Sequence, residues 1–258
     1  MIDKNAIVVL GAKIAPDVYV GPFSVSGEEV EIGAGSWIGP HVVIQGKTTI
    51  GKNNKVFQFA SIGADPQHTK YAGEDTSVEI GDNNVFHEYC SIHRGTVQGH
   101  KVTKIGDRNF LMAYTHVAHD CILGNDNIFA NTATLAGHVT IGNNIVLGGF
   151  VKILQFCTLG DYCFIAGDTG ITKDVLPYVF VSALHGQAKT YGLNLIGLKR
   201  HGFSVEVLHT LKHAYNIICR QGLGVEEAIT ALNKMLPDCQ EIVPLIEILS
   251  KTKRGIVR

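Results

Sequence analysis

The 258-residue sequence lacks the features of membrane, disulfide-rich and nucleic-acid-binding proteins. No apolar run approaches the roughly 18 residues of a membrane span, and the N-terminus, MIDKNAIVVLGAK, has no small-residue cleavage pattern. The 6 cysteines form no C-x-x-C pair and no disulfide framework, which favours a reducing compartment. The formal net charge is -1, so no overall field attracts nucleic acid or anionic lipid. We therefore expect a cytoplasmic protein with no membrane insertion and no nucleic-acid partner.

The sequence does contain an apolar residue at every sixth position. The pattern covers residues 14–62 with one break at Ser26, returns over 80–92, and runs unbroken over 105–171. A period of six fits neither an α-helix nor simple strand alternation, but it fits short strands joined by tight turns around a common axis. The residue after the apolar one is usually Gly or Ala, which allows close backbone approach at a corner. This pattern is typical of a parallel β-helix.

Two positions of each hexad are expected to face the interior: the apolar residue, and the residue four places after it, which is often small or β-branched. Cys121, Cys157 and Cys163 occupy the second of these positions, so we interpret them as core residues rather than nucleophiles. If three hexads close one coil, residues 18 apart stack at about the 4.8 Å spacing of neighbouring strands.

The β-helix is predicted over residues 1–184. Two polar, glycine-bearing segments interrupt the repeat at 64–78 and 94–104, and we expect both to be loops that leave the coil. Residues 185–203 are expected to be a linker.

A helical period begins at residue 204. Ser204 is a plausible N-cap for a helix that continues to Arg220, and two more helices are expected near 225–235 and 239–250. The sequence therefore predicts a mainly β protein, a parallel β-helix with a small α-helical domain over 204–258.

Four histidines occupy repeat positions that do not face the interior: His93, His116, His119 and His138. They are therefore either solvated surface residues or parts of a site. The motif YTHVAHD contains two of them. By the 18-residue spacing, one outer column contains His119, Gly137, Gln155 and Lys173, and the next contains Asp120 and His138.

This column has the composition of a general-base site. A histidine can take a proton near neutral pH, a neighbouring aspartate can orient its ring, and a corner N–H can stabilise an oxyanion. The alternative is a zinc site formed by His116, His119 and His138, because some hexapeptide β-helices are zinc carbonic anhydrases. No cysteine or carboxylate set completes a closed metal site around those histidines.

Nearly the whole chain resembles the bacterial UDP-N-acetylglucosamine acyltransferases that begin lipid A synthesis. The matching segments are "GPFSV", "QFASIG", "KYAGE", "IHRGTVQG", "HVAHDCILGN", "NTATLAGHV", "QFCTLG" and "GLKRHGFS". The resemblance implies a left-handed β-helix and a homotrimer with sites between subunits. It also implies that an R-3-hydroxyacyl group moves from the phosphopantetheine of acyl carrier protein to the sugar 3-hydroxyl of a UDP-sugar, with no cofactor and no metal.

The resemblance also assigns roles to single residues. His119 is implied to be the general base, Asp120 its partner and Gly137 the oxyanion donor. Gly167 matches the position that limits acyl length and, as glycine, resembles members that accept longer chains. Residues implied to line the sugar and acyl pocket are Lys70, His93, His116 and His138, and those nearer the nucleotide, phosphates or donor are Gln155, Asn194 and Arg200. The basic residues implied to meet the acidic carrier protein include Lys199, Arg200, Lys251, Lys253 and Arg254.

Four positions depart from the family pattern: His68, Leu154, Ile196 and His201. They lie on the sugar and nucleotide side, so we count His68 and His201 among the substrate-binding candidates. The departures leave two further alternatives, which are N-acyl transfer to a 3-amino UDP-sugar and a non-catalytic trimeric scaffold.

Overall fold

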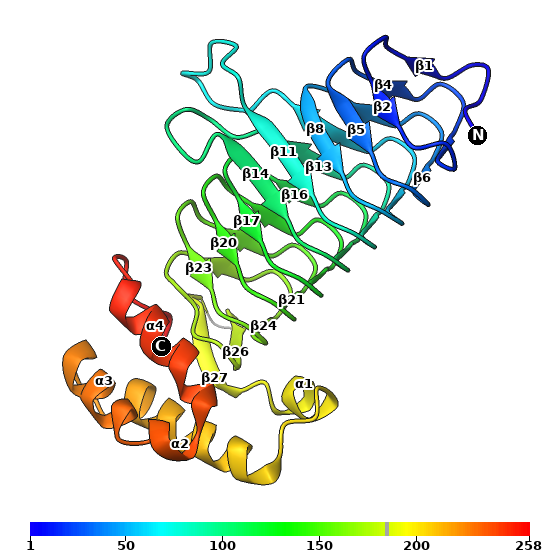
Figure 1. Cartoon of the computed structure of the whole chain (residues 1–258). Helices are drawn as coiled ribbons and strands as arrows, with labels where there is room; N and C mark the ends of the chain where they lie inside the picture. The colour runs from blue at the N-terminus through cyan, green and yellow to red at the C-terminus, as the bar shows by residue number, and fades with distance from the viewer. Residues whose placement is uncertain (184–185) are drawn as a thin grey trace.

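The computed structural model describes residues 1–183 and 186–258, and in this part of the chain the strands form three sheets wrapped around one axis (Figure 1). The coil is a parallel β-helix, as the six-residue period predicts, and it is left-handed, as the resemblance implies. Each full coil contributes one strand to each sheet. We name the sheets A, B and C, and we name each corner after the sheet whose strands precede it.

Sheet A contains β3 (Tyr19–Val20), β6 (Trp37–Ile38), β9 (Lys55–Val56), β12 (Val85–Phe86), β15 (Phe110–Leu111), β18 (Ile128–Phe129), β21 (Val146–Leu147), β24 (Phe164–Ile165), β26 (Val179–Ser182) and β27 (Lys189–Leu193). Sheet B contains β1 (Ile7–Val8), β4 (Val25–Ser26), β7 (Val43–Ile44), β10 (Ser61–Ala64), β13 (Ser91–His93), β16 (His116–Val117), β19 (Thr134–Leu135), β22 (Lys152–Ile153) and β25 (Gly170–Ile171). Sheet C contains β2 (Lys13–Ile14), β5 (Val30–Ile32), β8 (Lys47–Ile50), β11 (Ser77–Ile80), β14 (Val102–Ile105), β17 (Ile122–Leu123), β20 (Thr140–Ile141) and β23 (Thr158–Leu159).

The register of sheet B shows the predicted stacking. His116 on β16 pairs with Thr134 on β19, and Thr134 pairs with Lys152 on β22. The interior is filled by the two predicted positions of each hexad, so Cys121 and Cys157 are fully buried together with the apolar residues. Burial raises the pKa of Cys121 to about 12 and that of Cys157 to about 11. Both thiols are therefore protonated near neutral pH and act as core residues.

Each corner needs one residue with left-handed backbone angles. At the B corner these include Asp120, His138 and Phe156, with φ of 60°, 62° and 65°. Such angles are unfavourable for residues other than glycine. At the A corner the cost is offset by stacking between coils, because the rings of Tyr89 and Tyr114 lie 4.7 Å apart and nearly parallel.

A ladder of buried asparagines supports the C corner. Asn127 N donates to Asn109 Oδ1 over 3.0 Å, and Asn109 N donates to Asn84 Oδ1 over 2.8 Å. The amide of Asn109 also donates to Gly124 O over 3.0 Å. The side chains therefore satisfy backbone groups that the short strands leave unpaired.

The chain leaves the coil twice, at residues 65–76 between β10 and β11 and at residues 94–101 between β13 and β14 (Figure 1). Both segments are shorter than the loops expected from the sequence, because β11 starts at Ser77 and β14 at Val102. Those strands pair along their full length with their neighbours in sheet C.

The residues expected to be a linker contain regular structure. Strand β27 pairs antiparallel with β26 and so extends sheet A, and α1 (Leu195–Arg200) follows it. The side chain of Asn194 caps α1 by accepting a hydrogen bond from Gly197 N. The expected domain boundary at 184 and 185 lies outside the described residues.

Helices follow α1 at the C-terminal end of the coil (Figure 1). They are α2 (Val205–Arg220), α3 (Val225–Asn233), two short turns η1 (Leu236–Asp238) and η2 (Gln240–Ile242), and α4 (Val243–Lys251). Ser204 Oγ accepts a hydrogen bond from Val207 N and caps α2, as the sequence predicts. In the described ranges, no helix is long and apolar enough to cross a membrane.

The C-terminal tail returns to the coil at Asp174. Asp174 N donates to Gly255 O over 3.1 Å, and Val257 N donates to Asp174 O over 2.8 Å. The carboxylate of Asp174 accepts from Thr252 Oγ1 over 2.6 Å and from Thr158 N over 2.8 Å. The tail therefore covers the end of the coil in a fixed position, with Ile256 buried.

The asparagine ladder gives a stability prediction. Replacement Asn109→Ala leaves a buried N–H and a buried carbonyl without partners, so we expect the free energy of unfolding to fall by about 2–3 kcal/mol. The control Asn5→Ala lies at an exposed position and is expected to change it by less than about 0.5 kcal/mol. Urea unfolding followed by circular dichroism measures both. Equal stability of the two variants would show that the ladder does not stabilise the coil.

Candidate functional site

The four histidines lie outside the coil interior, but they are not solvated. His119 follows β16 at the B corner and is 4% exposed, and His93 at the end of β13 is 8% exposed. His116 and His138 are partly buried. The interpretation as solvated surface residues is therefore wrong, because the two loops cover this part of the B corner.

Asp120 is the most constrained group of the site. Its carboxylate accepts hydrogen bonds from Thr96 Oγ1 over 2.6 Å, from Thr96 N over 3.0 Å and from His100 N over 2.8 Å. It also accepts from His119 Nδ1 over 2.9 Å. Burial alone would raise the pKa of Asp120, but these hydrogen bonds together hold the pKa below its ordinary value. Asp120 is therefore an anion that is buried and fully hydrogen-bonded.

Thr96 and His100 were not identified from the sequence. Both belong to the loop at 94–101, which has no repeat phase to place them. One sequence feature does point to the contact of this loop with Asp120, namely Gly99. A side chain at Gly99 would overlap the carboxylate of Asp120, so glycine is needed for the loop to close over it.

The ring of His119 is oriented by Asp120. Because the carboxylate can only accept, His119 Nδ1 donates this hydrogen bond, and Nε2 is the ring nitrogen left to face a substrate. The ring of His68 lies 5.1 Å from it and that of His138 lies 5.0 Å from it, both edge to face. The imidazole of His119 is thus held between two other imidazoles.

Gly137 packs directly against His119, as the column of residues 18 apart predicts. A methyl group at Gly137 would lie 2.7 Å from His119 Nε2, so the position has room only for glycine. Among the described residues, no backbone or side-chain acceptor binds the Gly137 N–H. An unpaired N–H next to a histidine base is suited to binding a developing oxyanion.

His93 on β13 and His116 on β16 are neighbours in sheet B, with ring centroids 5.3 Å apart. His93 Nδ1 lies 2.6 Å from Asp65 O, and His116 Nδ1 lies 2.8 Å from Ser91 Oγ. Burial lowers the pKa of His116 to about 4 and also lowers the pKa of His93. Both rings are therefore neutral near pH 7 and offer hydrogen bonds rather than charge.

Arg94 holds the loop that contains His68. It donates to Gly63 O over 2.5 Å and to Tyr71 Oη over 2.8 Å, and it forms an ion pair with Asp65. This loop also contains Lys70, which is exposed. Arg94 thus fixes the segment that places His68 against His119.

Other residues that the resemblance assigns to the site lie on different edges of the coil. Gly167 is exposed at the A corner. Asn194 Nδ2 donates to Tyr162 O at the C corner, and the ring of His201 lies 5.1 Å from that of Tyr162. Arg200 is the last residue of α1 and is exposed. One copy of the chain therefore does not bring these residues to His119. The exposed Gln155, in contrast, lies on the same corner as His119.

One group of metal-ligating residues occurs in the described part of the chain. Ligand atoms of His119, Asp120 and His138 lie within 4.8 Å of one another, and His116 is not part of the group. The oxygens of Asp120 already accept hydrogen bonds from Thr96, His100 and His119. A metal bound by Asp120 would have to break them, so the donor set fits a histidine base better than a resident cation.

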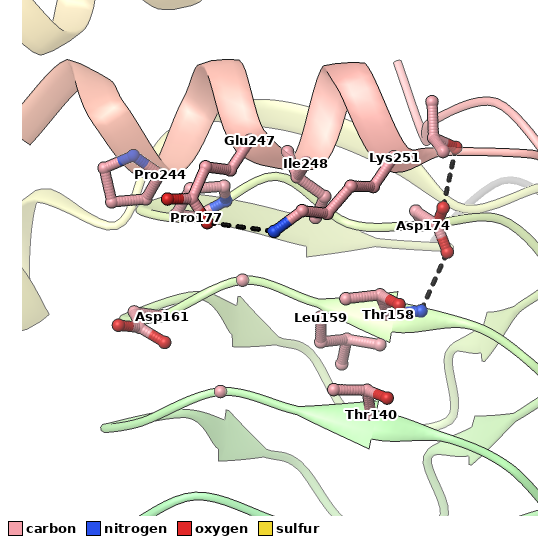
Figure 2. Close-up of a pocket in the computed structure, with 13 residues that line it drawn as sticks. Thr140, Thr158, Leu159, Asp161, Asp174, Pro177, Pro244, Glu247, Ile248 and Lys251 are labelled. Atoms are coloured by element: carbon pink, nitrogen blue, oxygen red, sulfur yellow. Dashed lines mark hydrogen bonds and ion pairs between the residues drawn. The ribbon is translucent and has the colours of Figure 1, made fainter. Parts of the chain in front are cut away.

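A separate cavity of about 480 Å³ lies between α4 and sheet C (Figure 2). It is lined by residues such as Thr140, Thr158 and Ile248, and none of the histidines contributes to it. Its lysine, Lys251, forms an ion pair with Glu247 over 3.3 Å. The cavity therefore offers no imidazole, unlike the site at the B corner.

Comparisons with known proteins match both parts of the chain. The family profile "Udp N-acetylglucosamine O-acyltransferase; Domain 2" matches residues 174–257. The profile "Bacterial transferase hexapeptide (six repeats)" matches residues 103–137.

Relatives that match along the whole chain are also UDP-N-acetylglucosamine O-acyltransferases. The chain is 46% identical over 257 residues to the acyl-[acyl-carrier-protein]–UDP-N-acetylglucosamine O-acyltransferase of Syntrophobacter fumaroxidans, covering 100% of this chain and 99% of the relative. It is 48% identical over 258 residues to that of Halorhodospira halophila, with the same coverage. The crystal structure of UDP-N-acetylglucosamine O-acyltransferase from Moraxella catarrhalis superposes with a TM-score of 0.97 at 43% identity, covering 100% of this chain and 99% of that one.

The lowered pKa of His116 predicts a pH-dependent stability. The folded protein keeps His116 neutral down to a pKa of about 4, whereas the unfolded chain takes up a proton near 6.5. The free energy of unfolding is therefore at its full value above pH 6.5. It decreases as the pH falls toward 4, by about 1–2 kcal/mol between pH 7 and pH 5. Urea unfolding of the wild type and of His116→Gln at both pH values measures this difference. Parallel pH dependence of the two proteins would contradict it.

Proposed function

The chain belongs to the UDP-N-acetylglucosamine O-acyltransferase family, and we propose that it transfers an R-3-hydroxyacyl group from acyl carrier protein to the 3-hydroxyl of UDP-N-acetylglucosamine, the first step of lipid A biosynthesis. The observation that carries the proposal is the buried Asp120–His119 pair, whose free Nε2 lies beside Gly137. This arrangement supplies a base and an oxyanion donor at one point, which is what acyl transfer to a hydroxyl requires.

In the first step, His119 Nε2 takes the proton of the sugar 3-hydroxyl while that oxygen attacks the thioester carbonyl. The C–O bond forms as the carbonyl π electrons move to oxygen, and the Gly137 N–H donates to the resulting oxyanion. The positive charge of the His119 imidazolium is balanced by Asp120, which stays ionised because its carboxylate accepts four hydrogen bonds from protein groups.

In the second step, the tetrahedral intermediate collapses and the C–S bond breaks. The pantetheine sulfur leaves with the bonding electrons and takes the proton from His119 Nε2, which restores the neutral base. The transfer is direct, with no covalent enzyme intermediate. The neutral rings of His93, His116 and His138, together with Lys70, His68 and Gln155, are proposed to bind the sugar and acyl groups around the reacting atoms.

We propose a homotrimer in which each site lies between two copies of the chain. Two observations support this proposal. Within one copy, several residues that the resemblance assigns to the site lie on edges of the coil that do not contain His119: Gly167, Asn194, Arg200 and His201. The A corner also exposes an aromatic column, with Tyr114 57% and Phe150 58% exposed, which is an apolar surface suited to packing against a second copy.

Gly167 and the exposed basic residues have roles in the same proposal. Gly167 leaves space where a side chain would shorten the acyl pocket, and the exposed basic residues of α1 and the tail are suited to the acidic carrier protein. Among these, Lys199 and Arg200 end α1, and Lys253 and Arg254 lie in the tail.

The proposal predicts a large effect of His119→Ala. Loss of the base is expected to lower kcat by about 10³-fold or more, with little change in the melting temperature. Mass spectrometry of the product, with 3-hydroxyacyl carrier proteins of several lengths and either UDP-N-acetylglucosamine or its 3-amino analogue, measures the rate and identifies the acceptor.

The matched control is His213→Ala, which removes an exposed histidine from α2 and is expected to retain full activity. Near-normal turnover by His119→Ala would eliminate the general-base mechanism. Transfer only to the 3-amino analogue would replace the proposed acceptor.

A further inference from the structure

The side chain of His138 is held by packing rather than by hydrogen bonds. Its Nε2 lies 3.9 Å from Asp120 Oδ2, which is beyond hydrogen-bonding distance, and among the described residues its ring has no hydrogen-bond partner. One face of the ring stacks on Phe156, with centroids 4.5 Å apart and planes 10° apart. Its orientation toward His119 therefore depends on the phenyl ring.

Phe156 is in turn contacted by the tail. Arg254 Cζ lies 5.7 Å from the centroid of the Phe156 ring, within the range of a cation–π contact. Arg254 lies between Thr252 and Gly255, both of which are hydrogen-bonded to Asp174. In the described residues, Arg254 forms no ion pair with a carboxylate. The guanidinium is thus placed over the ring by an anchored segment.

We propose that Phe156 and Arg254 are positioning residues for the acyl transfer, which hold the imidazole of His138 against the His119–Asp120 pair. The inference rests on the proposed function. It gives the tail a role in the site besides any contact with the carrier protein.

The cost of this position supports the inference. Phe156 is 53% exposed and has a φ of 65°, so an apolar aromatic residue occupies a strained corner position at the surface. Folding of the corner does not require a ring, because Asp120 occupies the equivalent position two coils earlier, although rings such as Tyr89 and Tyr114 also occupy left-handed positions at the A corner. Among the left-handed aromatic residues at the described corners, Phe156 is distinguished by its contact with a guanidinium, that of Arg254.

A set of variants tests the stack. Phe156→Ala removes it, Phe156→Leu keeps apolar volume without a flat ring, and Phe156→Tyr restores the ring. The matched control is Tyr19→Ala, because Tyr19 also stacks on an aromatic ring of the next coil, that of Trp37, with centroids 6.0 Å apart and planes 8° apart, away from the corners. We expect kcat to fall about tenfold for the alanine variant and severalfold for the leucine variant, whereas the tyrosine variant stays within about twofold of wild type.

Arg254 is tested in the same assay. Arg254→Met is expected to lower kcat about threefold, and Arg254→Lys, which keeps the charge, to recover part of the loss. A loss for Arg254→Met that appears only in KM for the acyl carrier protein would mean that the residue binds the donor and does not position His138.

A titration of His138 by NMR separates positioning from a merely structural effect. Burial lowers the pKa of His138, so removal of the phenyl ring admits water and is expected to raise that pKa toward its ordinary value. The other groups that act on His138 are Asp120, His119, His100 and His68, and all are retained in these variants.

Tyr19→Ala is expected to leave both kcat and the His138 titration unchanged. The proposal is overturned if Phe156→Ala keeps wild-type kcat and the same His138 pKa, or if Tyr19→Ala lowers kcat equally. The titration does not depend on turnover, so it remains informative even if His119→Ala shows that the proposed function is wrong.

Discussion

The stacking of one coil on the next, at an offset of 18 residues, is the constraint on which the rest of the molecule depends. Parallel pairing of His116 with Thr134 and of Thr134 with Lys152 fixes the offset in sheet B. The same offset brings Gly137 against His119, Phe156 against His138, and Asn127 against Asn109. A shift of one residue would exchange interior and exterior positions and remove both the core and the site.

The site is formed where this regular scaffold meets irregular segments. The coil supplies His119, Asp120 and Gly137 at rigid corner positions, and the loop at 94–101 supplies the donors that keep Asp120 ionised. A buried carboxylate would be very unfavourable without such partners. The scaffold therefore positions His119, which we propose to be the base, and the loop keeps its partner Asp120 ionised.

The sequence predicted those parts of the site that follow from the repeat phase. The column of His119 and Gly137, the interior thiol of Cys121 and the cap at Ser204 depend on local spacing, and the structure has each of them. Burial of the histidines was not predicted, because a loop such as 94–101 has no period that reveals where it folds back. Strand β27 was also missed, because its pairing with β26 depends on a hairpin rather than on a hexad. The contact of Arg254 with Phe156 joins segments nearly one hundred residues apart and has no sequence signal.

The central claim is that His119 of one copy works together with residues of α1 from another. Two variants, His119→Ala and Arg200→Ala, are each expected to be inactive as pure proteins. When they are unfolded together and reassembled, random mixing gives a site with both residues intact in about one quarter of cases. The account predicts that about a quarter of wild-type activity returns. An absence of recovered activity in verified mixed assemblies would contradict a site shared between copies.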